Sequence, residues 1–439
     1  MKNYIIVILL IISSKSFSQQ GFETIISTST DIYATESFCI ENGFLILGSR
    51  KYDDNLDGII YKLDSQGLLI DSLVIEEMSK TYFKHSFLLE NGLIRTLSAK
   101  EKEDQAGFYN IKTIDIDENL NIYNEILYGD IIIGEFWAHI HAIPFPNDRI
   151  FIASTAMDTL PYNGLQYLNK LMFIMNQEGE ILFDSIYNQS SLEMTMDFIR
   201  FPETDNLLLY CRSNFEGGNI VKPINIIDTN YNLIESHFIE DYSLQASLRA
   251  LNDTAFVICN KESDDKKESW YTAISIYDLN FERINHAITG QADTASYPAF
   301  NNSIALIENN IYIGSTFNVI SEDYPIEKSF FKLDKLDLNL NINWQKYYGG
   351  DAYYKLLDVR ETPDNGILLT GNRYDHGETG PFERDIFILK VNEDGLITST
   401  NQEQSIPIKN AIITPNPGKN YLQLHTGIYP AKLQIFNIN

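Results

Sequence analysis

Cysteine is scarce in this chain: its 439 residues include three, Cys39, Cys211 and Cys259. An odd number excludes a fully paired disulfide framework. Cys211 and Cys259 each follow an apolar strand in successive repeats, which leaves a disulfide between them open. Their apolar surroundings favour the other interpretation, in which each cysteine is a small buried core residue.

Positive charge is also in short supply. The chain has 33 Lys and Arg against 60 Asp and Glu, a net charge of −27 at pH 7. This balance argues against general binding to nucleic acid or anionic lipid and favours a soluble surface. The chain lacks a G-x-S-x-G elbow, an H-E-x-x-H pair and a phosphate-binding glycine loop. Catalysis would therefore depend on carboxylates, as in enzymes that cleave sugars, and we assign no catalytic residue.

Long hydrophobic runs are missing, and the one apolar run at the N-terminus is short. Lys2 precedes eight apolar residues, Ile5 to Ile12, and Ser16-Phe17-Ser18 offers the small residues that a signal peptidase needs. Eight residues are too few to cross a bilayer. The pattern predicts a signal peptide over residues 1–18, with a buried N-terminal strand as the alternative. We therefore expect an exported protein, secreted or at the cell surface, without a membrane span.

A helical period is absent too, and a repeat takes its place. An apolar strand that ends in a polar turn recurs seven times, at steps of 50 to 59 residues. The turns are at Asp64, Asp117, Asn176, Asp228, Asp278, Asp337 and Asn392. A second marker, an apolar strand after a Gly, Asn or Asp turn, keeps the same phase: Phe44–Leu47, Leu93–Leu97, Ile150–Ala153, Leu207–Tyr210, Ala255–Cys259, Ile311–Ile313 and Ile367–Leu369. A period near 50 residues is typical of propellers and arrays.

Each repeat contains about four short apolar or alternating runs, separated by Asn, Asp and Gly turns. In the first repeat these are Thr35–Ile40, Phe44–Gly48, Gly58–Leu63 and Leu68–Val74. The sequence therefore predicts an all-β fold, a seven-bladed β-propeller of four-stranded antiparallel blades over residues 19–402. A pair of β-sandwiches is the alternative, but a sandwich has no reason to keep two markers in phase. We expect residues 22–28 to complete the last blade and close the ring.

The stretch from Trp344 to Leu396 is the clearest copy of the repeat. Its features are a Trp and Gly-Gly leader, an Asn-Gly turn, an apolar strand ending in Gly and an Asp-led strand ending in Lys: Trp344, Gly349-Gly350, Asn365-Gly366, Ile367–Gly371 and Asp385 to Lys390. In these features it resembles the propeller-type repeats of secreted proteins from Bacteroidetes-like bacteria. The repeat type covers roughly residues 35–400 and implies a fold rather than a function.

The C-terminal segment has a Pro-Asn-Pro entry followed by two alternating strands: Ile413–Pro417, Tyr421–Leu424 and Leu433–Ile438. It resembles the start of a type IX secretion sorting domain, a small β-sandwich that carries cargo across the outer membrane. Such a domain usually continues for several more strands, whereas this sequence stops at Asn439. The resemblance implies a truncated sorting domain over residues 403–439, with the type IX secretion machinery as a partner. An ordinary C-terminal hairpin is the alternative.

A candidate calcium loop lies in the first repeat. The run from Asp53 to Gly58 fits the pattern D-x-N-x-D-G, and Asp64 stands at the twelfth position. The predicted ligands are Asp53, Asn55, Asp57 and Asp64. Residues 59–63 are needed as a strand, however, and the twelfth ligand is normally a Glu. An acidic solvated loop is the alternative.

Two histidines, His139 and His141, lie on one face of a predicted strand, because side chains repeat every second residue. This strand corresponds to Tyr354–Asp358, the first strand of a blade, which lines the central channel of a propeller. Two imidazoles could begin a metal site, but no third ligand can be assigned. Packing or hydrogen bonding in the channel is the alternative.

These features predict an exported, non-enzymatic propeller that binds a glycan or a surface protein through its loops. One alternative is a carbohydrate-active enzyme, which a cluster of facing carboxylates in a channel mouth would favour. Another is a structural component of a surface assembly, which a large exposed apolar patch would favour.

Overall fold

The computed structural model describes residues 21–397, with short gaps, and two further strands at 412–415 and 422–425. The gaps are at 53–54, 76–80, 104, 134–139, 146–147, 158–167, 188–191, 202–203, 215–219, 229, 231, 240–245, 264–269, 292–293, 321–324 and 378–382. The described residues 21–397 belong to one compact unit, and the strands at 412–415 and 422–425 belong to a second one. The predicted signal peptide lies outside the described residues.

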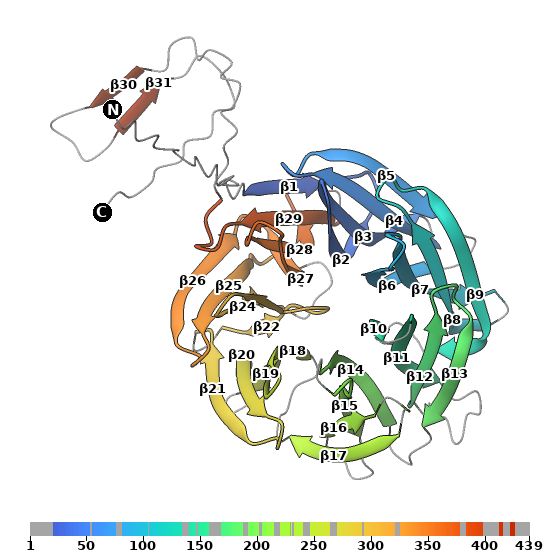
Figure 1. The fold of residues 1–439 in the computed structure, drawn as a ribbon. Helices are drawn as coiled ribbons and strands as arrows, with labels where there is room; N and C mark the ends of the chain where they lie inside the picture. Colours follow the sequence, from blue (N-terminus) through green and yellow to red (C-terminus); the bar gives the residue numbers. More distant parts are fainter. Residues whose placement is uncertain are drawn as a thin grey trace, which may run out of the picture. The chain divides into compact units, whose positions relative to one another are not determined.

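The first unit consists of seven antiparallel blades around a central axis (Figure 1). Blade 1 is β2 (Ile32–Ile40), β3 (Gly43–Tyr52), β4 (Asn55–Asp64) and β5 (Leu69–Ile75). Blade 2 is β6 (Thr81–Leu88), β7 (Ile94–Lys102), β8 (Gln105–Ile116) and β9 (Ile122–Ile133). Blade 3 is β10 (His141–Phe145), β11 (Arg149–Met157), β12 (Leu168–Asn176) and β13 (Ile181–Tyr187). Blade 4 is β14 (Leu192–Arg200), β15 (Leu207–Asn214), β16 (Ile220–Ile227) and β17 (Leu233–Ile239). Blade 5 is β18 (Ala246–Asn252), β19 (Ala255–Ser263), β20 (Trp270–Asp278) and β21 (Arg283–Thr289).

In blade 6 the innermost position is shared by two short strands. These are β22 (Ser296–Pro298) and β23 (Ile304–Ile307), which both pair with β24 (Asn310–Phe317). The blade continues with β25 (Phe330–Asp337) and β26 (Ile342–Gly349). Blade 7 has β27 (Tyr353–Glu361), β28 (Ile367–Tyr374) and β29 (Asp385–Val391) from the end of the chain. The seven-bladed prediction is confirmed, and the described residues contain no helix.

The ring is closed by the beginning of the chain. β1 (Phe22–Ile26) pairs antiparallel with β29, from Phe22 opposite Lys390 to Ile26 opposite Ile386, and becomes the outer strand of blade 7 (Figure 1). This confirms the prediction that residues 22–28 complete the last blade. Because β1 and β29 pair within one sheet, the ring presents no open blade edge between the first and last repeats.

The seven turn residues that mark the repeat all form the same turn at the end of the third strand of their blade. In each, the Asp or Asn side chain accepts the backbone N–H four residues later. At Asp337, Oδ1 accepts the N–H groups of Asn339 at 2.8 Å and Asn341 at 2.9 Å, and Leu340 has a positive φ of 59°. A carboxylate or amide oxygen at this position therefore replaces the hydrogen bonds that the turn backbone cannot make itself.

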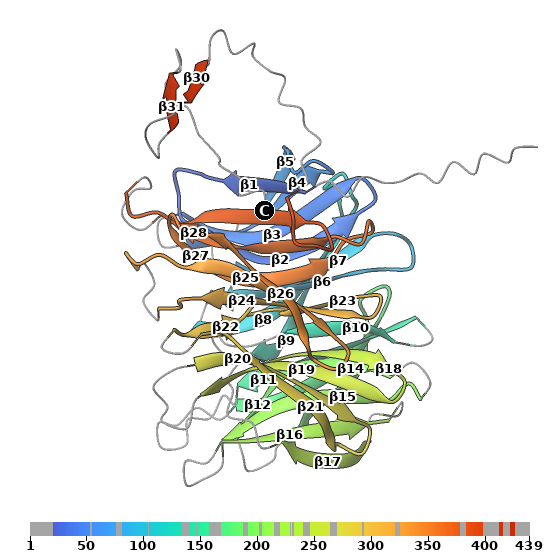
Figure 2. The same cartoon turned by 90° about the vertical axis from the view of Figure 1, so that its left-hand side faces the viewer.

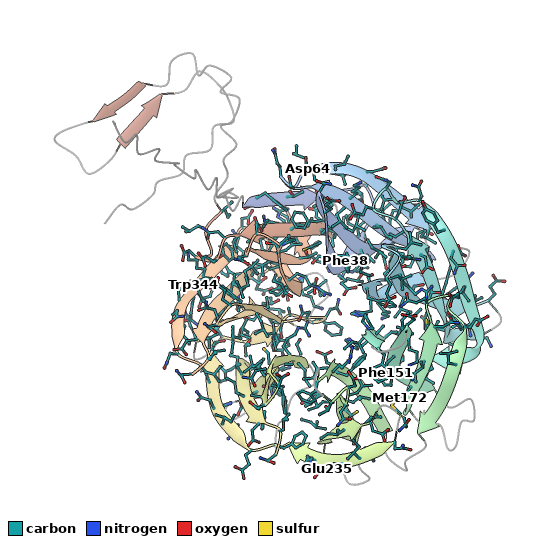
Figure 3. All side chains as sticks on the ribbon, viewed as in Figure 1. Phe38, Asp64, Phe151, Met172, Glu235 and Trp344 are labelled. Carbon is teal, nitrogen blue, oxygen red and sulfur yellow. The ribbon has the colours of Figure 1, made fainter. Side chains whose placement is uncertain are left out.

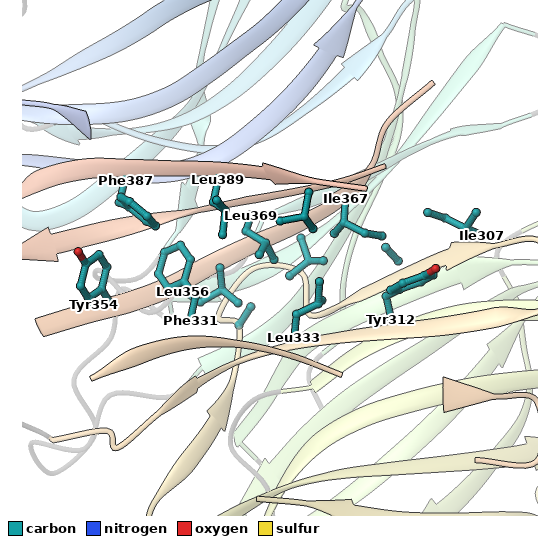
Figure 4. Close-up of a cluster of buried hydrophobic side chains, with 14 of the residues drawn as sticks. Ile307, Tyr312, Phe331, Leu333, Tyr354, Leu356, Ile367, Leu369, Phe387 and Leu389 are labelled. Carbon is teal, nitrogen blue, oxygen red and sulfur yellow. The ribbon is translucent and has the colours of Figure 1, made fainter. Parts of the chain in front are cut away.

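Apolar side chains fill the space between neighbouring blades. In the cluster between blades 6 and 7, Phe331 packs against Tyr354 and Phe387, with ring centroids 5.9 and 5.2 Å apart (Figure 4). Each fully buried side chain of this kind contributes about 1.5–3 kcal/mol. β28 and β29 are buried at every position, whereas β26 alternates between exposed and half-buried residues. Burial on both faces explains why middle strands such as β28 and β29 contain continuous apolar runs, whereas outer strands such as β26 alternate.

The innermost strands of the blades face the central axis, and their turns lie at the two faces of the ring. Figure 2 shows the blades edge-on, with strands running between these faces. In Figure 3, Phe38 of β2 lies towards the axis, whereas Asp64 and Glu235 lie at the rim. Several outer strands begin with exposed apolar residues, among them Leu69, Ile122 and Ile234.

The second unit contains one antiparallel pair, β30 (Ile412–Pro415) and β31 (Leu422–His425). These strands coincide with the first two segments that resemble a sorting domain, while Leu433–Ile438 lies outside the described residues. The sorting domain therefore stays a prediction. Within the described part of the chain, no helix is long and apolar enough to cross a membrane.

Candidate functional site: the central channel

A cavity of about 310 Å³ lies among the innermost strands, and every blade contributes to its lining. Its lining residues include one polar side chain from each blade in turn: Glu36, His85, His141, Asp197, Arg249, Asn302 and Arg360. We call these seven residues the channel ring. The steps between them are 49, 56, 56, 52, 53 and 58 residues, close to the steps of the turn markers. The repeat therefore delivers a polar group to the axis once per blade.

β-Bulges aim several of these side chains at the channel. In blades 1, 2 and 4 the strand register shifts immediately before Glu36, His85 and Asp197, and in blade 7 it shifts before Asp358. A bulge inserts one residue and so turns the following side chain towards the opposite face of the sheet. Polar residues thereby reach the axis from strands whose other faces pack in the core.

Glu36 is 2% exposed and joins three blades. Its Oε1 accepts a hydrogen bond from Arg360 Nη2 and lies 3.2 Å from His85 Nδ1. His85 Nε2 lies 2.9 Å from the backbone oxygen of Ala142 in blade 3. Burial acts to raise the pKa of the Glu36 carboxyl, but its interactions with His85 and Arg360 prevail and lower it. Glu36 is thus held as a carboxylate, while its Oε2 is buried without a hydrogen-bond partner among the described residues.

Asp197 occupies the corresponding place in blade 4. Its two oxygens accept the backbone N–H groups of Phe198 at 2.8 Å and Leu248 at 2.7 Å. His141 Nδ1 and Arg249 Nη1 each lie 3.7 Å from it. Burial outweighs these favourable partners and raises the pKa of the Asp197 carboxyl. The channel lining therefore contains two carboxyls whose pKa values are shifted in opposite directions.

Asp358 lies behind the lining and fixes the orientation of Arg360. It is fully buried and accepts the Ser37 N–H at 2.9 Å, the Ser37 hydroxyl at 2.6 Å and Arg360 Nε at 3.1 Å. Burial raises the pKa of Asp358, with Arg360 opposing that shift. Asn302 plays a similar part in blade 6, where its Oδ1 accepts Arg249 Nη2 at 2.5 Å. Both arginines are thus anchored from behind.

Cations outnumber anions in the lining. The cavity is bordered by four cationic side chains, Lys84, Arg200, Arg249 and Arg360, against the carboxylates Glu36 and Asp197. This ratio is the reverse of the whole chain, in which acidic residues prevail by 60 to 33. Burial lowers the pKa of the Lys84 ammonium to about 8. Phe198, Phe300 and three isoleucines supply apolar walls.

Two of the four predicted calcium ligands, Asp57 and Asp64, are not brought together. Asp53 lies outside the described residues, and Asn55 and Asp57 belong to β4, which continues to Asp64. At about 3.3 Å per strand residue, Asp57 and Asp64 lie roughly 23 Å apart, too far to share an ion. Asp57 pairs with Arg50 Nη2 at 3.0 Å, and Asp64 caps its turn. Residues 55–64 pair with β3 as a strand, and the calcium site stays a prediction.

The other predictions about side chains concern the histidine pair and the two buried cysteines. His141 lines the channel as expected, whereas His139 lies outside the described residues. Within the described ranges no group of three His, Cys, Asp or Glu side chains is placed to hold a metal ion. Cys211 and Cys259 are buried in the second strands of blades 4 and 5, and no disulfide joins them. They act as small core residues.

Sequence reasoning found His141 but missed the other six members of the channel ring. The signal was present: a polar residue in or beside the first strand of each repeat, in phase with the two markers. It was hidden because inner strands also carry polar residues that face elsewhere, and in blades 1, 2 and 4 a bulge sets which one reaches the axis.

No family model matches the sequence, and no curated protein matches it. Among solved structures, the chain is similar to the β-propeller domain of the Trilobed protease from Pyrococcus furiosus, at 10% identity and a TM-score of 0.46, covering 89% of this chain and 99% of that one. It is also similar to Drosophila Plexin A in complex with Semaphorin 1b, at 8% identity and a TM-score of 0.48, covering 85% and 88%. A mutant of NanB sialidase from Streptococcus pneumoniae has 10% identity and a TM-score of 0.42, covering 85% and 71%.

Proposed function

We propose that this protein is an exported binding protein whose central channel takes a small polar ligand. The observation that carries the proposal is the channel ring, in which all seven blades place a polar side chain around one cavity of about 310 Å³. Small-molecule sites are concave and mostly apolar, with a few convergent polar groups. The mixture of Phe and Ile walls with anchored arginines, histidines and an asparagine has this character.

Export is the second half of the proposal, and sequence features support it. They are the apolar run of residues 5–12 with its small-residue cleavage pattern, and the segment from Ile413 that resembles a type IX sorting domain. We expect the mature protein to begin after residue 18, outside the cell or at its surface. N-terminal sequencing of protein from fractionated cells tests this, and full-length protein retained in the cytoplasm would contradict it.

Binding is tested by measuring the melting temperature of the full chain against a panel of sugars, sugar acids, sugar phosphates and amino acids. A ligand that binds only the folded state stabilises it by about 2.7 kcal/mol at a hundredfold excess over its Kd. Arg249→Gln in the channel should abolish the shift, whereas Arg283→Gln on the exposed outer strand β21 should not. A shift that both variants retain would place the ligand outside the channel, and no shift with any compound would reject the proposal.

A carbohydrate-active enzyme is the second candidate, because the environments of Glu36 and Asp197 shift their pKa values apart. Such a division is the usual way in which a pair of carboxyls supplies one base and one acid. In this alternative Asp197 donates the proton and Glu36 acts as the carboxylate. Any oligosaccharide or glycoside that binds should then be cleaved at its glycosidic bond, and both Glu36→Gln and Asp197→Asn should stop cleavage. Recovery of the bound sugar intact after prolonged incubation would leave the binding function alone.

A further inference from the structure

The hydrogen-bonding capacity left in the channel lining is mainly that of donors. Glu36 Oε1 is occupied by Arg360 and His85, and Asp197 has accepted two backbone N–H groups. The remaining carboxylate oxygen of the lining, Glu36 Oε2, is buried from solvent. The carboxylates therefore offer a ligand few acceptor positions.

The three lining arginines, in contrast, each retain N–H groups. Arg360 donates from Nε to Asp358 and from Nη2 to Glu36, so its Nη1 has no partner among the described residues. Arg249 uses Nη1 and Nη2 for Leu248 and Asn302, which leaves Nε. Arg200 binds Asp205 through Nε and Nη2, which leaves Nη1 within the same described ranges. Each guanidinium is thus held from one side and has donors left over.

Anchored arginines are the preferred partners of oxyanions, because they offer a rigid set of charged donors. Lys84 adds a fourth cation to the same cavity as a point charge. Desolvation inside the channel strengthens these interactions relative to the surface, where acidic residues prevail. A volume of about 310 Å³ is at the lower end of the range for small-molecule sites, so it suits a single small molecule rather than a polymer segment.

From these donors and charges we infer that the ligand of the channel is a small oxyanion, a carboxylate or phosphate group on a molecule of about the size of one sugar. Arg249, Arg360 and Lys84 bind the anionic group, and the Phe198 and Phe300 side of the cavity takes the remainder. This inference rests on the proposed function, since it names the chemistry of the ligand for the same site. It adds that neutral ligands of equal size bind more weakly.

The experiment is calorimetric titration of the full chain with four matched probes: glucuronate, glucose 6-phosphate, glucose and glucosamine. Glucuronate or glucose 6-phosphate should bind at least about tenfold more tightly than glucose, as expected for charge-assisted hydrogen bonds. The difference between these two anions tells carboxylate from phosphate recognition. Raising sodium chloride from 50 to 500 mM should weaken anion binding and leave glucose binding unchanged. This salt test needs no variant.

Lys84→Gln provides the matched change within the channel, with Arg283→Gln as the surface control of equal charge loss. The first should weaken anion binding about tenfold and the second should not change it, with unaltered melting temperatures showing that both fold. Glucose or glucosamine binding as tightly as the anions would overturn the oxyanion inference but leave the channel as a binding site. Absence of binding by all four probes would overturn the inference, and the wider panel then decides on the proposed function.

Discussion

Asp31 and Arg384 join the first and last repeats where the ring closes. Arg384 Nη2 and Nε each lie 3.1 Å from an oxygen of Asp31, and the Arg384 backbone N–H donates to Asp31 at 2.8 Å. Tyr33 adds its hydroxyl to Asp31 at 2.5 Å and places its ring 4.0 Å from the guanidinium. The ion pair therefore reinforces β1 at the point where its strand leaves blade 7 and the chain enters blade 1.

Replacing Asp31 should weaken closure of the ring. In Asp31→Asn the buried side chain loses its charge but keeps its size, and Arg384 loses its counterion. Since hydrogen bonds to charged groups contribute about 1.5–3 kcal/mol, we expect the free energy of unfolding in urea to fall by roughly 2–3 kcal/mol. Asp71→Asn, at an exposed position of β5, is the control and should change nothing measurable. Equal stability of the two variants would show that closure does not depend on this pair.

The repeating turn tolerates Asn as well as Asp, because Asn176 and Asn392 occupy two of its seven copies. Asp337→Asn should therefore fold as the parent does, whereas Asp337→Ala should lower the urea midpoint, since the N–H groups of Asn339 and Asn341 lose their acceptor. The side-chain and backbone hydrogen bonds also lower the pKa of Asp337 below 3.8. Its stabilising contribution is present above that pH and is lost as the pH falls through the lower native value. A urea midpoint for Asp337→Ala equal to that of Asp337→Asn at pH 7 would contradict this role.

The overall fold could be predicted because its signals are local. Each polar turn satisfies its own backbone within five residues, so the seven turns are visible in the sequence without knowledge of their neighbours. Ring closure was predicted because the last repeat offers only a weak fourth strand, Ile397–Thr400, whereas residues 22–28 offer an additional strand. The channel network could not be predicted, because Glu36 and Arg360 are 324 residues apart in sequence and meet only in the closed ring.

The calcium prediction sets a local metal-loop pattern against strand pairing in the same segment. Asp53, Asn55 and Asp57 have the spacing of a metal loop, but the same segment pairs with β3 from Leu56 opposite Lys51 to Asp64 opposite Gly43. Nine backbone pairs with β3 and the burial of Ile59 and Ile60 stabilise the strand more than the spacing of the carboxylates could stabilise a loop. The apolar residues that follow the motif decided the conformation.

Two glycines in second strands allow the bulges that shape the channel. A Cβ on Gly371 would lie 2.1 Å from the backbone oxygen of Lys355, next to the bulge before Asp358, and Gly48 has the same relationship to Tyr33 in blade 1. Gly371→Ala should lower the free energy of unfolding by about 1–3 kcal/mol, because the inner strand must move. Gly129→Ala is the control, since a Cβ there meets nothing within 4 Å. If Gly371→Ala were as stable as Gly129→Ala, the close approach would not constrain the bulge.

Glu36 should give the channel a characteristic dependence of stability on pH. Its pKa is lowered from the ordinary 4.5, because its interactions with His85 and Arg360 outweigh the effect of burial, which acts to raise it. A carboxyl with a lowered native pKa contributes stability that is fully present above about pH 4.5 and is lost as the pH falls through the native value. Glu36→Gln should therefore lower the free energy of unfolding by about 3 kcal/mol at pH 7, the low end for breaking a buried ion pair. Urea midpoints measured from pH 7 to pH 3 should fall less steeply for Glu36→Gln than for the parent, so that the two curves converge at acid pH. Parallel curves over that range would mean that the contacts of Glu36 with His85 and Arg360, which join blades 1, 2 and 7, do not depend on its carboxylate charge.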